Sequence, residues 1–317
     1  MAEIKKFCAP IMIFMRRVRL TKIAVMAMLT FSSASMLNAE GLPQNQPGTT
    51  FTLWQLPNQT PTPIMSYVIM TVHGQLIVID GGTADDAPYL RRFIHDHGNK
   101  VTFWLITHPH LDHMNAFREI ITKPEGVVIE AVWGSFNPPT WCEKYPDDDV
   151  DRQEYRKFMT AVQHAGYRIQ ELSLGQTFVL DGISLTILSV RNPEIIANAY
   201  NNSSVVFKVK DQKKSVLFLA DLGHEGGEKL LKSKYAEQLS SDYVQMAHHG
   251  QNGVGKEFYM RCHHKYCLWP TPRWLWNNDN GKGMDSGTWK TLEVRKWMAD
   301  LNVEKHYCMF NGLEEIK

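Results

Sequence analysis

Apolar runs typical of strands alternate with amphipathic segments along most of the chain. Three early segments are rich in β-branched and aromatic residues, are separated by Pro, Asn or Gly, and predict strands: residues 51–56, 66–72 and 75–79. Residues 87–97 carry apolar side chains at helical spacing before Gly98, and residues 101–106 form a continuous apolar run. The chain therefore opens with a sheet and a strand–helix–strand unit.

The same alternation continues to the end of the chain. Further helices are expected at residues 116–121, 149–164, 227–232, 235–239 and 288–300. Further strands are expected at residues 127–133, 178–180, 184–189, 204–210, 215–219 and 243–246. Because strands and helices are mixed throughout without a long spacer, we expect a single layered α/β (α+β) domain over residues 49–317.

The N-terminal segment has the pattern of an export signal. Basic residues precede the apolar run 23–37, and Asn38-Ala39-Glu40 follows it. Residues 1–39 are expected to be a bacterial signal peptide cut after Ala39, with an uncleaved membrane anchor as the alternative, and residues 40–48 a linker. The protein would then be secreted, periplasmic or anchored outside the cytoplasm.

Charge gives little support for polyanion binding. The chain has 34 Lys and Arg against 33 Asp and Glu. Residues 1–39 hold six of the basic residues and one acidic residue, which leaves 28 basic and 32 acidic side chains and a formal charge of −4 for the rest. The longest basic clusters, residues 152–157 and 208–214, are mixed in sign, so no nucleic-acid track is predicted.

Cysteine spacing does not match a zinc module. Four cysteines lie beyond the N-terminal segment, at Cys142, Cys262, Cys267 and Cys308. The run from Cys262 to Cys267 includes two histidines, but its spacing fits no standard four-ligand zinc site, so a structural role is favoured over a metal site or a local disulfide.

The sharpest chemical pattern follows the apolar run 101–106 and reads Thr107-His108-Pro109-His110-Leu111-Asp112-His113. Three imidazoles and a carboxylate within six residues supply donors that zinc and similar divalent cations accept. In an extended turn, His108 and His110 would point the same way, which leaves Asp112 and His113 to face a second ion. The pattern therefore predicts a metal site.

Two later strands end on further candidate ligands. One runs into Asp221, and the other runs into His248-His249-Gly250. By itself, an aspartate at a strand end is usually a cap or turn former, and paired histidines are usually surface residues. Together with the histidine turn they form a coherent ligand set drawn from distant segments, as a folded metal centre requires.

These residues resemble the metallo-β-lactamase-fold hydrolases over roughly residues 50–260. Asp80-Gly81-Gly82, His108 to His113 and Asp221 match the family's early turn, its His-x-His-x-Asp-His signature and its bridging aspartate. The turn 201–204 and His248-His249-Gly250 are most similar to the branch that contains the hydrolase domain of bacterial DNA-uptake channel proteins and the cell-wall choline-phosphate esterases.

The resemblance implies a four-layer αββα sandwich with two divalent ions at one edge, zinc before manganese. It implies that His108 and His110 bind the first ion, that Asp112 and His113 bind the second, and that Asp221 bridges them. His248 is the expected last ligand. His249 is the alternate ligand, or a contact to phosphate and the transition state.

One departure from the family concerns the first ion. Many members place another histidine between the signature and the bridging aspartate, but here only His164 lies there, near a predicted helix end, where a structural role is expected. Asn202 and Ser203 occupy the neighbouring turn and are expected to line the site or hold a substrate oxygen. The first site would then be the weaker one.

Two metal ions can lower the pKa of a bridging water and polarise a scissile group, so the resemblance implies hydrolysis by a metal-bridged hydroxide that Asp112 orients. Branch similarity places phosphodiesters and phosphate esters, of cell-wall, nucleotide or small-molecule origin, before lactones, thioesters and β-lactams. A binding module that keeps the fold without catalysis is the alternative from another class.

Residues 260–317 are rich in Trp and Pro. We expect an ordered loop near the pocket, in which Trp274 packs on substrate, or equally a structural lid on the core. The acidic run 145–149 is expected to cap the helix that follows it.

Overall fold

The computed structural model describes residues 51–146 and 148–317. The expected signal segment 1–39 and linker 40–48 lie outside the described residues. Within the described ranges, no helix is both long enough and apolar enough to cross a membrane.

The first sheet has eight strands in the order β15-β1-β2-β3-β4-β6-β7, with β5 also paired to β4. Strands β1, β2 and β3 form an antiparallel meander, and β4 to β7 run parallel to β3. The bounds are β1 Thr52–Gln55, β2 Ser66–Met70, β3 Leu76–Asp80, β4 Lys100–Ile106, β5 Val128–Ile129, β6 Val132–Gly134, β7 Ile169–Glu171 and β15 Glu314–Ile316.

The second sheet has seven strands in the order β14-β13-β12-β11-β10-β9-β8. Strands β8 to β11 are antiparallel, and β11 to β14 are parallel. The bounds are β8 Thr177–Leu180, β9 Ile183–Ser189, β10 Val206–Lys210, β11 Ser215–Phe218, β12 Tyr243–Gln245, β13 Tyr266–Trp269 and β14 Lys305–Cys308.

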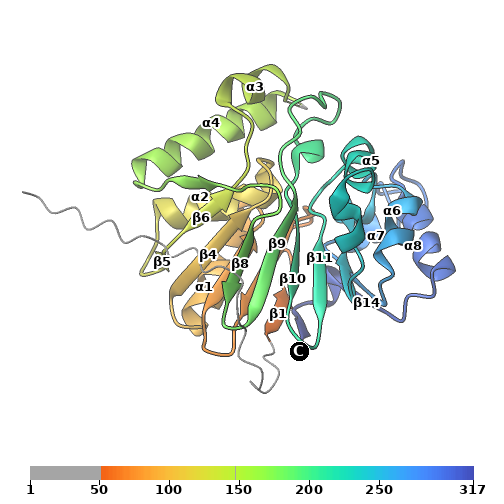
Figure 1. The fold of residues 1–317 in the computed structure, drawn as a ribbon. Helices are drawn as coiled ribbons and strands as arrows, with labels where there is room; N and C mark the ends of the chain where they lie inside the picture. The colour runs from red at the N-terminus through yellow and green to blue at the C-terminus, as the bar shows by residue number, and fades with distance from the viewer. Residues whose placement is uncertain (1–50, 147) are drawn as a thin grey trace, which may run out of the picture. The chain divides into compact units, whose positions relative to one another are not determined.

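Apolar side chains fill three layers. Tyr67, Ile79 and Phe103 of the first sheet pack with Phe207 and Phe218 of the second. The outer face of the first sheet is covered by α1 (Ala87–Asp96), α2 (Leu111–Thr122) and α4 (Asp149–His164). The outer face of the second is covered by α5 (His224–Leu231), α6 (Lys256–Cys262) and α8 (Thr291–Asp300) (Figure 1). This is the expected αββα sandwich.

The C-terminal section differs from the expected loop or lid. Residues 266–269 and 305–308 are strands of the second sheet, and β15 returns to pair with β1 of the first. The Trp-rich segment between them includes the short helix α7 (Arg273–Trp276). Periodicity alone did not reveal these strands because each has four residues and no hairpin turn beside it.

Strand ends from both sheets meet at one edge. The segment after β4 leads to His108, the segment after β11 leads to Asp221, and the segment after β12 leads to His248 and His249. The carboxyl ends of β-strands are where α/β sheets place ligands, and here the two sheets bring theirs to the same place. The fold thus joins three segments that are far apart in the sequence.

Candidate metal centre

The signature histidines span a loop-to-helix junction and not an extended turn. His110 has extended backbone angles (φ −88°, ψ 151°) and is the N-cap of α2, whereas Asp112 and His113 lie in its first helical turn. The expected extended turn is therefore correct only as far as His110. The helix start separates the signature into two groups that face different neighbours.

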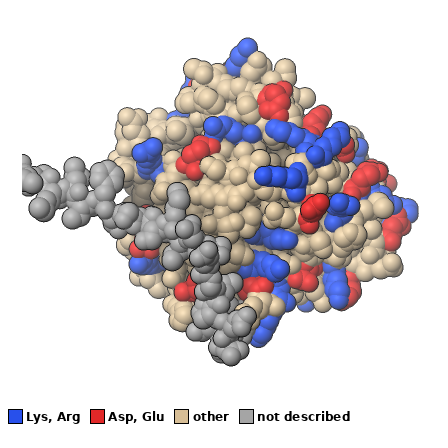
Figure 2. Space-filling view, in the orientation of Figure 1, with Lys and Arg blue, Asp and Glu red and all other residues tan. Residues whose placement is uncertain are grey.

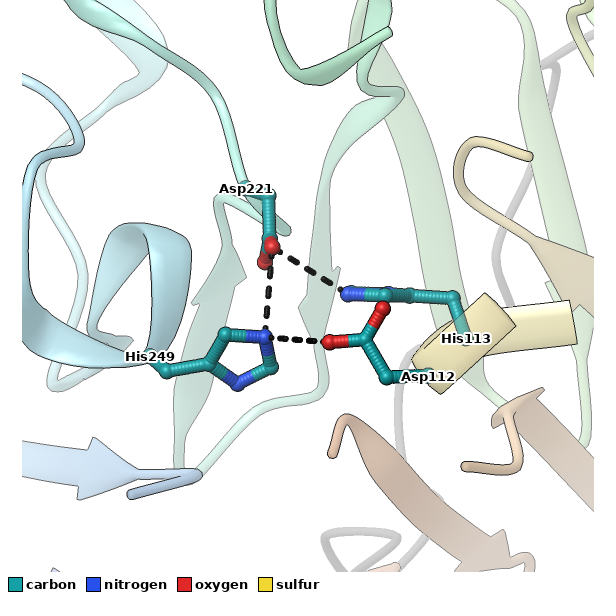
Figure 3. Close-up of side chains that lie close together, drawn as sticks. All are labelled: Asp112, His113, Asp221 and His249. Atoms are coloured by element: carbon teal, nitrogen blue, oxygen red, sulfur yellow. Dashed lines mark hydrogen bonds and ion pairs between the residues drawn. The ribbon is translucent and has the colours of Figure 1, made fainter. Parts of the chain in front are cut away.

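Asp112 and His113 of the signature form one cluster with Asp221 and His249, which Figure 3 shows. The Nε2 atom of His249 lies 3.0 Å from Asp112 Oδ2 and 3.2 Å from Asp221 Oδ2, and His113 Nε2 lies 3.3 Å from the same Asp221 oxygen. Tetrahedral zinc with bonds of about 2.1 Å separates its ligand atoms by roughly 3.4 Å. The donors of Asp112, His113, Asp221 and His249 are spaced to hold one divalent ion.

A second cluster shares Asp221. The Nε2 atom of His108 lies 3.0 Å from Nδ1 of His110 and 4.0 Å from Asp221 Oδ2. These three residues also place their ligand atoms within 4.8 Å of one another. Asp221 is 1% exposed and belongs to both clusters, which is the arrangement expected of a bridging carboxylate.

His248 and His249 occupy different positions at this edge. Both have left-handed backbone angles (φ 50° and φ 54°), which side chains with a Cβ adopt at a cost. The geometry places His249, and not the expected His248, in the four-residue cluster. The Nε2 atom of His248 lies 4.0 Å from Asp221 Oδ2 and 3.4 Å from Asn201 Nδ2, beside the three-residue cluster.

Gly250 makes this strained pair of histidines possible. Its φ is +78°, and a Cβ there would lie 2.4 Å from the ring of Trp269. The carbonyl of His249 accepts a hydrogen bond from Thr271 Oγ1, and its Nδ1 lies 2.9 Å from the carbonyl oxygen of Pro270. The segment after β13 therefore fixes the ring and turns its Nε2 toward the cluster.

Several buried polar atoms at the centre have no hydrogen-bond partner, among them His113 Nε2, Asp221 Oδ1, His248 Nδ1 and Asn201 Oδ1. Buried polar atoms are almost always satisfied in folded proteins, so a group of exceptions in one place needs an explanation. Imidazole nitrogens and carboxylate oxygens at these distances fit divalent metal ions.

Burial and close charges shift the protonation of these groups. Burial opposes charge on Asp221, but His249 and His113 hold its pKa well below the ordinary value. Burial also opposes charge on His113, but Asp221 and Asp80 raise its pKa to about 10. For His108, burial and the neighbouring His113 lower the pKa well below the usual value, so its ring is neutral and able to donate a lone pair.

Asp80 supports the four-residue cluster. Its Asp-Gly-Gly turn was noted in the sequence, but no role was assigned to the Asp80 side chain. It is fully buried, its Oδ2 lies 2.7 Å from His113 Nδ1, and its two oxygens accept from Thr107 N and Thr107 Oγ1. Gly81 allows α2 to approach, since a Cβ there would lie 3.2 Å from Ala116 Cβ. The turn thus fixes the His113 ring so that Nε2 faces Asp221.

We expect Asp80→Ala to lower both the stability of the protein and its metal affinity, although Asp80 is not itself one of the candidate ligands. Thr107 and His113 would lose their acceptor inside the protein, which costs about 3–5 kcal/mol of unfolding free energy for a buried charged network. Loss of such an orienting contact also lowers metal affinity by about 10–100-fold. Denaturant unfolding and metal titration check both, and unchanged affinity would contradict the orienting role. Asp80→Asn, which keeps one acceptor oxygen, should have a stability and a metal affinity between those of the wild type and Asp80→Ala.

Gln245 is a second supporting residue with no sequence signal. Its amide is fully buried; Oε1 accepts from Leu219 N and Ala220 N, and Nε2 donates to the carbonyls of Ala220 and Met246. Ala220 has a φ of 48°, so the chain bends sharply just before Asp221. The four hydrogen bonds of Gln245 hold this bend and so aim the shared carboxylate.

The residues expected to bind substrate are occupied by other contacts. Asn202 is fully buried, with its amide bonded to Ala197 O, Glu225 Oε2 and Gly226 N. Ser203 is buried and its hydroxyl accepts from Asn137 Nδ2. Trp274 donates to Pro61 O at 2.7 Å, which ties α7 to the loop before β2.

The remaining sequence expectations concern residues outside the clusters. His164 is exposed at the last residue of α4 and belongs to neither cluster. Asp148 caps α4 by accepting from Asp151 N at 2.9 Å, as expected of the acidic run. Cys142, Cys262, Cys267 and Cys308 are buried free thiols.

A family model described as the metallo-β-lactamase superfamily matches residues 59–256, which include both clusters. The chain belongs to the metallo-β-lactamase superfamily. Among curated proteins, no sequence match was found.

One solved structure shares this fold, and two others align with the chain less closely. The metallo-β-lactamase-fold protein YhfI from Bacillus subtilis is 11% identical with a TM-score of 0.52, covering 84% of this chain and 100% of its own. The β-hydroxylase CmlA is 12% identical with a TM-score of 0.48, over 87% of this chain and 55% of its own. A diphosphatase of the PhnP family is 11% identical with a TM-score of 0.44, over 73% and 93%.

Proposed function

We propose that this metallo-β-lactamase-fold protein is a metal-dependent hydrolase of phosphodiesters or phosphate esters. The observation that carries the proposal is the sharing of the buried Asp221 carboxylate between a three-residue and a four-residue ligand cluster. Two ions held side by side can each contact one oxygen of a phosphoryl group. The preference for phosphate over lactones, thioesters or β-lactams is supported by the similarity of the 201–204 turn and the His-His-Gly segment to the esterase branch.

The residues of the chain have separable roles in this proposal. His108 and His110 would hold one ion, Asp112, His113 and His249 the other, and Asp221 both. A bound pair of divalent ions would make water more acidic and polarise the substrate's phosphoryl oxygen. Asp112 is 18% exposed in its side chain, so one edge of its carboxylate can also accept a proton from an incoming water.

Charge outside the centre supports a small or isolated ester and not a long nucleic acid. In the basic cluster 152–157, Arg152 pairs with Asp149, Arg156 with Glu143 and Lys157 with Glu154. Figure 2 shows Lys and Arg interspersed with acidic and uncharged residues over one face. Paired surface charges of this kind form a solvated helix face and not a phosphate track.

Elemental mass spectrometry of protein that lacks residues 1–39, paired with hydrolysis of bis(p-nitrophenyl) phosphate, tests the proposal. We expect close to two equivalents of metal and turnover that depends on metal. A lactone, a thioester and a β-lactam run in parallel test the alternative substrates. Absence of metal after reconstitution would overturn the hydrolase and favour the non-catalytic binding module.

A pair of histidine variants makes the test specific. His110→Ala removes a donor of the three-residue cluster, whereas His164→Ala removes an exposed imidazole at the end of α4. We expect the first to lower turnover and the second to leave it unchanged. Equal activity of the two variants on every substrate class would remove the main support for catalysis at this centre.

We also propose that the protein acts outside the cytoplasm. The basic residues before the apolar run 23–37, and Asn38-Ala39-Glu40 after it, support export. N-terminal sequencing of protein recovered from a bacterial host checks this, and a start at Glu40 is the expected result. An intact N-terminus in the membrane fraction would indicate an anchor, and an intact N-terminus in the cytoplasm would contradict export.

A further inference from the structure

His110 is held from three directions. Its Nδ1 faces His108 Nε2 at 3.0 Å, on the side of the proposed first ion. Its Nε2 lies 3.5 Å from Asp151 Oδ2, within ion-pair distance, and both side chains are only 12% exposed. The ring of Tyr200 covers one face of the imidazole, with centroids 5.4 Å apart. A ring fixed in this way can present only Nδ1 to the cluster.

The carboxylate of Asp151 is delivered by a rigid element. Asp151 lies in the first turn of α4, and its backbone N–H donates to the capping Asp148. Helix α4 packs on α2, where Phe158 meets Phe117, and Glu154 of α4 pairs with Arg118 of α2. Since α2 also carries Asp112 and His113, the helix that supplies Asp151 is docked on the helix that supplies the second cluster.

We propose that Asp151 is a positioning residue that holds His110 for the first metal ion, a role that rests on the proposed dinuclear centre. The carboxylate at ion-pair distance favours a proton on Nε2 and so leaves the Nδ1 lone pair for the metal. A carboxylate behind a ligating imidazole also increases its basicity, and hence its affinity for the ion. Asp151 is not expected to touch either the ion or the substrate.

This role falls on the ion with fewer ligands. The first cluster has three donor residues and the second has four, so a misdirected His110 costs the first site a larger share of its coordination. Asp80 performs the corresponding task for His113 from inside the sheet. Asp151 performs it from a helix that lies between β6 and β7 in the chain, on the outer side of the first sheet.

Metal titration of the chelator-treated protein, without substrate, tests the proposal. Asp151→Ala is compared with Asp149→Asn, a matched control in the same helical turn whose side chain is 80% exposed and pairs with Arg152. Co²⁺ is the probe, because its visible absorption reports the coordination of each ion. We expect Asp151→Ala to lower the affinity for the more weakly bound Co²⁺ by about 10–100-fold. The affinity for the more tightly bound Co²⁺ should stay unchanged. Asp151→Asn, which keeps a neutral acceptor, should show a smaller loss.

The outcomes separate this proposal from a general structural effect. Affinities of Asp151→Ala equal to those of Asp149→Asn would overturn the positioning role. So would an equal loss of both ions together with a lower unfolding temperature of the metal-free protein. Recovery of the wild-type Co²⁺ spectrum in Asp151→Glu would support the positioning role, because the feature that Glu keeps from Asp is the carboxylate.

Failure of the proposed function gives a different result. If the wild type binds two ions and Asp151→Ala loses one, but no ester is hydrolysed, the hydrolase proposal fails and the positioning role stands. If the hydrolase is active and Asp151→Ala keeps wild-type affinities, only the positioning role fails. A wild type that binds no Co²⁺ would overturn both.

Discussion

Asp221→Asn is expected to release both metal ions and to lower ester hydrolysis by about 1000-fold, since metal assistance supplies several kcal/mol and each 1.36 kcal/mol is a factor of ten. The substitution changes one oxygen to an amide nitrogen and keeps the shape of the side chain. It removes the negative charge that His113 and His249 both face, at 3.3 and 3.2 Å. No other described carboxylate belongs to both clusters.

The control for this variant is another buried aspartate at the far end of the same strand. Asp211 is 6% exposed and lies in the turn before β11, where its carboxylate accepts from Lys213 N and Lys214 N. Asp211→Asn should lower stability and leave two ions bound. Metal content and turnover of the two variants are the measurements. Retention of both ions by Asp221→Asn would contradict a shared ligand.

Removal of metal is expected to lower the unfolding temperature by roughly 10 °C. An ion present at 1000 times its Kd stabilises the folded state by about 4 kcal/mol. For a domain of this size, each kcal/mol shifts Tm by about 2–4 °C. The effect should be large here because Asp80, Asp112 and Asp221 all lie in the centre, where the ions would neutralise their charge.

Thermal unfolding with zinc and with a chelator measures this shift. Asp221→Asn serves as the control, because a protein that no longer binds the ions should unfold at the same temperature in both conditions. Equal midpoints for the wild type with and without zinc would show that the clusters do not bind zinc in the folded state. A shift of equal size in the variant would assign the effect to other zinc sites.

Local sequence patterns predicted a helix or strand correctly where the pattern lay within one continuous segment of the chain. Helix α4 matches its expected range 149–164, and the strands expected within residues 178–189 and 204–219 form the antiparallel pairs β8–β9 and β10–β11. Apolar periodicity and turn residues determine such elements because they depend on neighbours in the chain. Four-residue strands with no hairpin turn beside them, such as β13 and β14, carried no such signal.

The candidate ligands were recognisable from sequence for a related reason. Metal chemistry limits the donors to a few residue types, so His108, His110, Asp112 and His113 stand out by composition and spacing alone. The sequence favoured His248 over His249 as the last ligand, whereas the structure places His249 in the four-residue cluster. That choice depends on a left-handed backbone at both residues, and on Thr271 and Pro270, which hold the His249 ring.

The sequence by itself therefore determined the mixed α/β composition, most helices and hairpins, and the inventory of metal-binding donors. Only the tertiary structure decided which donors share an ion and which residues aim them. Asp80 and Asp151 are 33 and 41 positions away from the histidines that they contact, and Asn202 looked accessible although it is fully buried. The physical reason is that burial and orientation are set by packing between distant segments, which no local pattern of residues encodes.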